Sequence, residues 1–460
     1  MKIKVLCSAT AVALLSGCTS IMQKNDFDSF DSKLVAGDYL GASEVALDHA
    51  GYDKDTGETD DLLWTLQAGA TLNSAGQYEF STKLLDASES FMKEEDSESI
   101  IEDSTEFAGS ILGNDAMLSY EQTQYDGVMG NTIKAWNFIS EADFSNARVE
   151  LNRAEERQRR AAEHFAELIK EREAEIKEES GDSALSVSKT IGSDETLKAL
   201  KAAGIEQGQW KPYEGYVNPF TTYSYGLNLM VSGKTKSDYA KAADAFKRVH
   251  SMTGSKTAKA DMDLARSLSK GASKSKLSNQ VWVIFENGQS TVKEERRVDL
   301  PIFLLSNNVS YSGIALPKLK KRGTAYESIT VNGVSTDTIS DMDKIIGAEF
   351  DTEFPYILAR EVTRVTIKTI AQKQVSDENQ LLGHAMGILQ LATTGADIRT
   401  FSALPSQYQA ARFVTKDNQV EIKAGSFTLP VELDANATKH IIYVKAVSNT
   451  VAPSVKVVNI

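Results

Sequence analysis

Prolines are nearly absent from the first half of this chain, and their absence constrains the fold more than any other feature of the sequence. From about residue 27 to residue 270 the only prolines are Pro212 and Pro219. Alanine, leucine, glutamate and lysine dominate the same region, and all four are strong helix formers. We therefore expect residues 31–270 to form an α-helical domain.

One segment of this region has the pattern of a helix, a turn and a second helix. Leu62, Leu66 and Ala70 fall on one helical face, Gly76 marks a break, and Tyr78 begins a second apolar stripe. A helix–turn–helix unit of about 34 residues is the period of tetratricopeptide repeats. An irregular helical bundle is the alternative. Further units are expected at residues 34–47, at 131–162 with a break near Ala142 and Asp143, and at 220–268. Two of these four units are convincing and two are degenerate.

Three other stretches of the N-terminal half lack the repeat pattern. Residues 153–179 are almost continuous charge with a thin apolar stripe, which favours a long exposed helix over a coiled-coil face. Residues 180–198 are rich in serine, glycine and aspartate, so we expect a loop. Residues 271–279 have the most linker-like composition in the chain.

After this linker the composition becomes that of a β-rich domain. Residues 281–288, VWVIFENG, are typical of a buried strand that ends in an Asn-Gly turn. A helical hairpin is expected within the domain, with apolar stripes at 356–373 and 380–391. Further strands are expected at residues 298–305, 328–333, 427–433, 441–447 and 455–458.

The expected fold class is therefore α+β multidomain. An N-terminal α-helical TPR-like repeat region is followed by a smaller C-terminal domain at 280–460, mainly antiparallel β with a helical insertion.

The N-terminus has the features of a secretory signal. Lys2 and Lys4 precede an apolar run too short to span a bilayer, and small residues then lead to Cys18. The run Leu-Ser-Gly-Cys resembles the lipobox of bacterial lipoproteins. The resemblance implies a signal peptide at 1–17, a lipid on Cys18 and a lipidated tether at 18–30; an ordinary signal peptide with a chance cysteine is the alternative. For a Gram-negative host, Thr19 in place of aspartate implies the outer membrane.

Composition excludes several classes of partner and site. The formal charge is −14, and it becomes −16 without the two signal-peptide lysines, which does not suit nucleic acid. Cys7 and Cys18 are the only cysteines, so the mature chain would have no free thiol. The five histidines form no metal-binding pattern, and neither a nucleophile elbow nor a phosphate-binding loop occurs. We expect no enzyme, no cofactor and no small-molecule substrate.

Two motifs are specific enough to examine as sites. In Tyr-Val-Asn-Pro-Phe at 216–220, Asn218 can cap a helix that begins at Pro219. Phe220 and Tyr223 then share one face, and peptide binding by these aromatic rings is the functional alternative to a structural role.

The second motif is Ala-Asp-Ile-Arg-Thr-Phe-Ser-Ala-Leu-Pro at 396–405. Here Arg399 or Arg412 is expected to bind nearby backbone carbonyls, while Asp397 accepts backbone amides. Contact of Arg399 with an anion or a glycan is the functional alternative.

Taken in order, the lipobox, the helical repeats, YVNPF, VWVIFENG and ADIRTFSALP resemble a family of uncharacterised bacterial lipoproteins with tetratricopeptide-like N-terminal helices. The resemblance implies a membrane-anchored accessory protein that faces the periplasm, and it implies no catalytic residue. Members occur with other envelope lipoproteins, including ones that resemble activators of peptidoglycan synthases. We expect a scaffold that binds an envelope protein through its helices. A peptidoglycan- or glycan-binding lipoprotein is the first alternative, and a hydrolytic envelope enzyme is the second.

Overall fold

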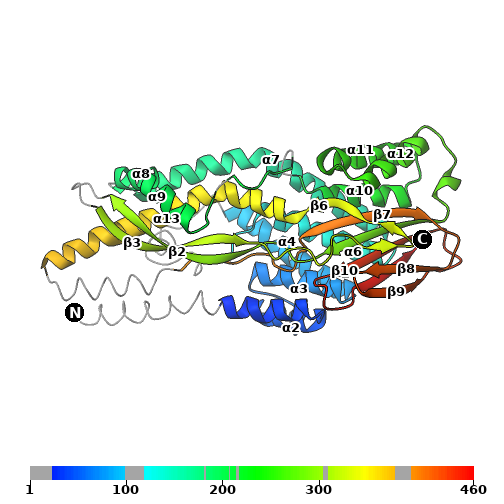
Figure 1. The fold of residues 1–460 in the computed structure, drawn as a ribbon, viewed down its shortest axis with the longest axis horizontal. Helices are drawn as coiled ribbons and strands as arrows, with labels where there is room; N and C mark the ends of the chain where they lie inside the picture. The colour runs from blue at the N-terminus through cyan, green and yellow to red at the C-terminus, as the bar shows by residue number, and fades with distance from the viewer. Residues whose placement is uncertain are drawn as a thin grey trace.

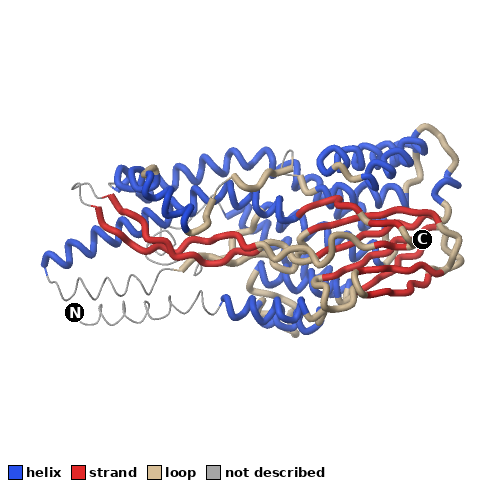
Figure 2. Tube along the Cα trace, in the orientation of Figure 1, coloured by secondary structure: helices blue, strands red, loops and turns tan. Residues whose placement is uncertain are grey.

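A computed structural model describes residues 23–98, 119–180, 183–206, 208–213, 217–303, 309–378 and 395–460. The fold is α+β, with helices in the N-terminal part and most strands in the C-terminal part, as predicted (Figures 1 and 2). The molecule is elongated, with stacked sheets at one end and a long ribbon at the other (Figure 1). None of the helices within these residues is long and apolar enough to cross a membrane. Cys18 lies outside the described residues.

Most helices of the N-terminal part pack against the next helix along the chain. A break separates α3 from α4 at Gly76, where φ is +79°, and another separates α6 from α7 at Ala142, where φ is +58°. Both breaks lie where the sequence predicts them. After a helix at residues 23–35, the helices are α2 (Tyr39–His49), α3 (Leu62–Ser74), α4 (Tyr78–Glu98), α6 (Gln124–Ser140), α7 (Phe144–Ser180), α8 (Ala184–Ile191), α9 (Asp194–Ala202), α10 (Pro219–Ser232), α11 (Lys236–Thr253) and α12 (Lys256–Ser269).

A five-stranded sheet lies beneath the helices. Its order is β11-β10-β1-β7-β6; β1 runs parallel to β10, and the other neighbours are antiparallel. Helices α6, α10, α11 and α12 contact one face of this sheet. The strands are β1 (Gln280–Asn287), β6 (Asp337–Asp341), β7 (Gln407–Val414), β10 (Lys439–Ala446) and β11 (Ser454–Asn459).

The other face of the five-stranded sheet packs on a four-stranded sheet of order β5-β4-β8-β9. Alternation along β1 explains the three layers: Val283 and Phe285 face the second sheet, whereas Trp282 and Ile284 face the helices. A strand buried on both faces reads as a continuous apolar run, as β1 does. The strands of the second sheet are β4 (Thr330–Val331), β5 (Val334–Ser335), β8 (Gln419–Ala424) and β9 (Phe427–Glu432).

A long two-stranded ribbon, β2 (Val292–Phe303) and β3 (Val309–Lys320), extends from this body together with α8, α9 and α13 (Met342–Glu378) (Figure 1). These elements share their own core, since apolar residues recur every fourth position along α13 and meet Leu300 of β2 and Leu316 of β3. The recurring residues of α13 are Ile346, Phe350, Phe354, Leu358 and Val362, of which the last four belong to that core.

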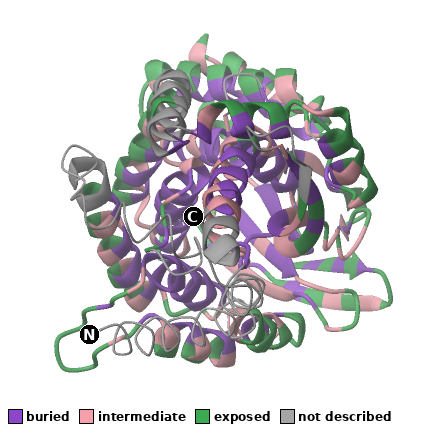
Figure 3. Ribbon diagram, turned by 90° about the vertical axis from the view of Figure 1, so that its left-hand side faces the viewer, coloured by how far each residue is buried: buried purple, intermediate pink, exposed green. Residues whose placement is uncertain are grey.

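The two halves of the chain share one hydrophobic core. A single buried cluster includes Leu66 and Trp136 from the helices together with Trp282, Tyr408 and Ile441 from the sheet. Seen along the long axis, buried residues fill the interior and exposed residues lie on the outer surface (Figure 3). The predicted domains 31–270 and 280–460 are therefore in direct contact through their apolar residues.

Several local predictions were wrong. Residues 23–30, predicted as part of the tether, are helical, because Phe27 and Phe30 pack on Trp64. The predicted linker 271–279 contains the short helix Lys274–Leu277, whose Leu277 is buried.

The predicted loop at 180–198 was also wrong, because it contains α8 and most of α9, whose apolar residues pack on β2. The predicted strand at 328–333 is the beginning of a hairpin that turns at Asn332 and Gly333, both with positive φ. Of the predicted helical hairpin, α13 covers the first stripe, and the second, at 380–391, lies outside the described residues.

Candidate functional site

Asn218 and Pro219 begin α10 in the way the sequence predicts. The Asn218 side chain accepts a hydrogen bond from the Phe220 backbone N–H at 3.0 Å, and Pro219 is the first helical residue. Phe220 is only 1 % exposed, and its ring stacks on that of Tyr408 with centroids 3.5 Å apart. Phe220 therefore joins α10 to β7, and its ring does not face solvent.

Asn218 also contacts four neighbouring elements. Its backbone N–H donates to Gln158 of α7, and its side-chain amide donates to the sulfur atoms of Met129 in α6, at 3.0 Å, and of Met342 in α13, at 3.4 Å. Ser340 of β6 donates to the Asn218 side-chain oxygen at 3.1 Å. Asn218 thus lies at the point where α6, α7, α10 and α13 meet.

Tyr223 is fully buried and binds a buried carboxylate. Its hydroxyl donates to Asp261 Oδ2 at 2.6 Å, while Trp282 Nε1 lies 3.1 Å and Arg412 Nε 2.7 Å from Oδ1. Burial raises the pKa of Asp261, and Arg412 and these hydrogen bonds oppose the rise. Arg412 also donates to the backbone carbonyl of Ala260 at 3.2 Å, as the sequence predicts. This cluster links α10 and α12 to the central strands.

Arg399 contacts the Asp397 carboxylate within the second motif and a backbone carbonyl from a distant part of the chain. Its guanidinium donates to both oxygens of Asp397, at 2.9 and 2.8 Å, and to the Ser119 carbonyl at 3.4 Å. Asp397 also accepts the Arg399 backbone N–H at 2.9 Å. Burial alone would raise the pKa of Asp397, but the bonds and charge of Arg399 hold it below its usual value.

The rest of the second motif binds the N-terminal helices through residues that the sequence analysis missed. Gln67 of α3 donates to the Thr400 carbonyl at 3.0 Å and accepts the Ala403 N–H at 2.9 Å. A glutamine inside the apolar run 62–72 was the only sequence signal for this contact.

Arg322 was missed as well. It donates to the carbonyls of Ser290 and Ser402, each at 2.6 Å, and lies 2.9 Å from Asp31 in the N-terminal helix. Through Arg322 and Gln67, residues 400–403 are connected to the helix at residues 23–35 and to α3.

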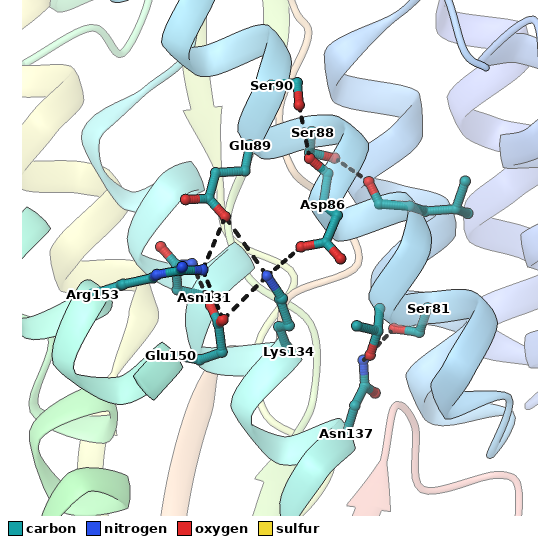
Figure 4. A network of polar contacts seen from close by, with 12 residues as sticks. Ser81, Asp86, Ser88, Glu89, Ser90, Asn131, Lys134, Asn137, Glu150 and Arg153 are labelled. Atoms are coloured by element: carbon teal, nitrogen blue, oxygen red, sulfur yellow. Dashed lines mark hydrogen bonds and ion pairs between the residues drawn. The ribbon is translucent and has the colours of Figure 1, made fainter. Parts of the chain in front are cut away.

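A polar network between α4, α6 and α7 also has a structural role (Figure 4). Lys134 of α6 is 5 % exposed in its side chain and pairs with Asp86, with Glu89 at 3.6 Å and with Glu150 at 3.2 Å. Arg153 pairs with Glu150 at 2.9 Å. Burial alone would lower the pKa of Lys134, yet the surrounding carboxylates raise it. Because every charge has an opposite partner, the network fixes how α4, α6 and α7 pair.

An open cleft lies next to Arg399, one of the candidate binding residues, and gives a ligand from solution access to it. Its volume is about 800 Å³, including the open mouth. The stretch before α6, the ribbon, α13 and residues 396–399 form its walls. Its charged lining is mixed in sign and includes Lys293, Glu353, Arg360, Asp397 and Arg399.

A second, more apolar hollow of about 460 Å³ lies on the other side of the start of α6, between Tyr213, Asn218 and α13. The described residues bring no three His, Cys, Asp or Glu side chains together in a way that would hold a metal ion. No protein-family model matches the chain, and neither a curated protein nor a solved structure matches it.

Proposed function

We propose that this protein is a non-enzymatic scaffold of the cell envelope, lipid-anchored at Cys18 in the outer membrane and facing the periplasm. It would bind an envelope protein through tetratricopeptide-like helices. The lipobox-like N-terminus supports the anchor. The rigid connection between both halves of the chain supports a scaffolding role, because a scaffold must present its surfaces at fixed positions.

The helix pairs support the kinship with tetratricopeptide repeats. A Cβ added to Gly69 of α3 would lie 2.7 Å from Leu85 of α4, and one added to Gly226 of α10 would lie 2.9 Å from Phe246 of α11. Close approach of a small residue on the first helix to a large residue on the second is what such pairs require. The pairs α3–α4, α6–α7 and α10–α11 would then be three repeat units.

The partner surface is expected on the helices that the sheet does not cover. The inner helices α6 and α10 pack on the five-stranded sheet, and every residue of α3 is buried. The side formed by α4, α7 and α11 is left for a partner. Its exposed residues include many charged ones, so we expect binding that weakens with salt. Examples are Lys83, Arg153, Arg160, Lys241 and Lys247.

The anchor and the partner surface need separate experiments. Labelling of cells with a fatty-acid analogue should mark the wild type but not Cys18→Ser, which should leave the membrane fraction. A photo-crosslinking residue at Lys247 on α11 should give a discrete adduct with an envelope protein, and one at exposed Thr428 on β9 should not. Adducts from Thr428 alone, or from neither position, would refute the partner surface without touching the anchor.

Binding of peptidoglycan or another glycan is a second candidate, favoured by the position of Arg399 on the wall of the open cleft. Tyr356, Pro317 and Lys293 line the same cleft and would supply apolar and charged contacts to a sugar chain. The full chain should then sediment with purified sacculi, and Lys293→Ala should weaken that sedimentation while leaving the fold intact. Equal sedimentation of both proteins would count against the cleft.

A further inference from the structure

Two buried carboxyl groups from different parts of the fold meet at the first turn of α6. Asp126 is 0 % exposed and Glu349 of α13 is 5 % exposed. Asp126 Oδ2 accepts the Thr123 N–H at 2.9 Å and the Tyr120 hydroxyl at 2.7 Å. Glu349 Oε1 accepts the next backbone amide, that of Gln124, at 2.5 Å. Since they bind consecutive amides, the two carboxyl groups are neighbours.

The pair is not fully satisfied as two carboxylates. Asp126 Oδ1 is buried and accepts no hydrogen bond from any of the residues that the structure describes. An ionised carboxylate in that position leaves charge on an unsolvated oxygen, whereas a neutral carboxylic acid does not. The backbone amides at the start of α6 stabilise an ionised carboxylate. Here these amides must stabilise two carboxyl groups, and the two negative charges would repel each other.

We propose that Asp126 and Glu349 form a proton-controlled joint between the helical layer and α13: with a proton on the pair the joint is closed, and with both groups ionised it opens. The joint lies between the two hollows, since residues 119–123 line the open cleft and Gln124 and Tyr125 line the more apolar hollow. Its opening would loosen α13, which leads from β6 into the ribbon end of the molecule.

Opposing influences set the pKa values of Asp126 and Glu349. Burial raises the pKa of Asp126 to about 6, against the hydrogen bonds of Thr123 and Tyr120 and the charge of Lys293. Burial, followed by the charge of Glu353, raises the pKa of Glu349 well above its usual range. The charged and titratable groups facing the pair are Tyr120 and Tyr125 before and within α6, Lys293 on β2, Glu353 on α13, Arg157 of α7 against Gly127, and the Asp397–Arg399 pair.

The sign of the effect follows from these shifts. Both groups bind protons more tightly in the closed joint than in an opened one, so closure is favoured at low pH and is lost as the pH rises through the folded-state pKa. For Asp126, a change from the ordinary pKa of 3.8 to about 6 corresponds to about a hundredfold change in the opening equilibrium.

Hydrogen exchange of the full chain at pH 5 and pH 7.5 tests the joint, with rates corrected for the intrinsic pH dependence of exchange. Peptides from the start of α6 and from 342–355 of α13 should lose at least tenfold protection at the higher pH in the wild type. The near-isosteric Asp126→Asn and Glu349→Gln should largely abolish that difference. Glu79→Gln is the matched control, because Glu79 is an exposed acid on α4 and its loss removes the same charge.

Two results would overturn the proposal. One is equal protection of the wild type at both pH values. The other is an unchanged pH effect in both variants when their circular dichroism shows that they are folded. A control peptide from β8 and β9 should show no difference between the two pH values in any of the proteins.

Discussion

Replacement of Phe220 by alanine tests whether this residue is structural or forms a binding surface. The ring is 1 % exposed, stacks on Tyr408 at 3.5 Å and lies 6.1 Å from the ring of Trp136. Deletion of a buried phenylalanine ring typically costs about 3–5 kcal/mol, which includes about 0.5–1.5 kcal/mol for a favourable aromatic pair. We expect a loss in this range, equal to a change of about two to three and a half powers of ten in the unfolding equilibrium.

Urea denaturation followed by tryptophan fluorescence and by far-ultraviolet circular dichroism measures this loss. The midpoint should fall with little change in the slope. Both signals should shift together, because Phe220 belongs to α10 while Tyr408 belongs to β7. Phe220→Leu, which keeps most of the buried volume, should recover a large part of the loss. A loss below about 1 kcal/mol in the alanine variant would refute the structural assignment, since surface substitutions stay within about 0.5 kcal/mol.

Three other substitutions test other parts of the structure. Arg322→Ala should cost about 1–3 kcal/mol in urea denaturation, because it removes the cation that pairs with half-buried Asp31 and the donor to two carbonyls, and Arg322→Lys should recover little since it lacks the planar fork. Lys134→Met should cost about 1–3 kcal/mol, and adding Glu150→Gln should restore part of the loss; no recovery would show that Glu150 does not depend on Lys134. Burial lowers the pKa of Lys456 to about 8, so the wild type should gain thermal stability from pH 8 to pH 10 and Lys456→Met should gain less; parallel melting curves would contradict this assignment.

Chemistry within a few residues was predictable from the sequence. The helix cap at Asn218 and the acceptance of a backbone amide by Asp397 both involve short polar side chains whose partners lie two residues away along the chain. The breaks at Gly76 and Ala142 belong to the same class. The carbonyls that Arg399 and Arg412 bind belong to Ser119 and Ala260, so the sequence predicts the kind of contact there but not the partner. What those residues do for a ligand or partner stays a prediction.

Contacts between distant parts of the chain could not be predicted in this way. Gln67 meets Ala403 across 336 residues of sequence, and Asp126 lies near Glu349 of α13, so both contacts depend on how distant elements pack. The short helices α8 and α9 have polar sequences that resemble a loop, and their few apolar residues become decisive only when the ribbon lies against them. Tertiary packing thus overrides local propensity at these positions.

The order of strands in the five-stranded sheet has a consequence for biogenesis. Strand β1 lies in the middle, yet its neighbours β7 and β10 follow it by more than a hundred residues. Until those late strands emerge during synthesis, the sides of α6 and α10 that face the sheet lack their apolar partners. Contacts between such distant segments form slowly, and the exposed surface invites aggregation. A chaperone that holds the chain until its C-terminus arrives would therefore raise the yield of folded protein, and truncation before β10 should send it to proteolysis.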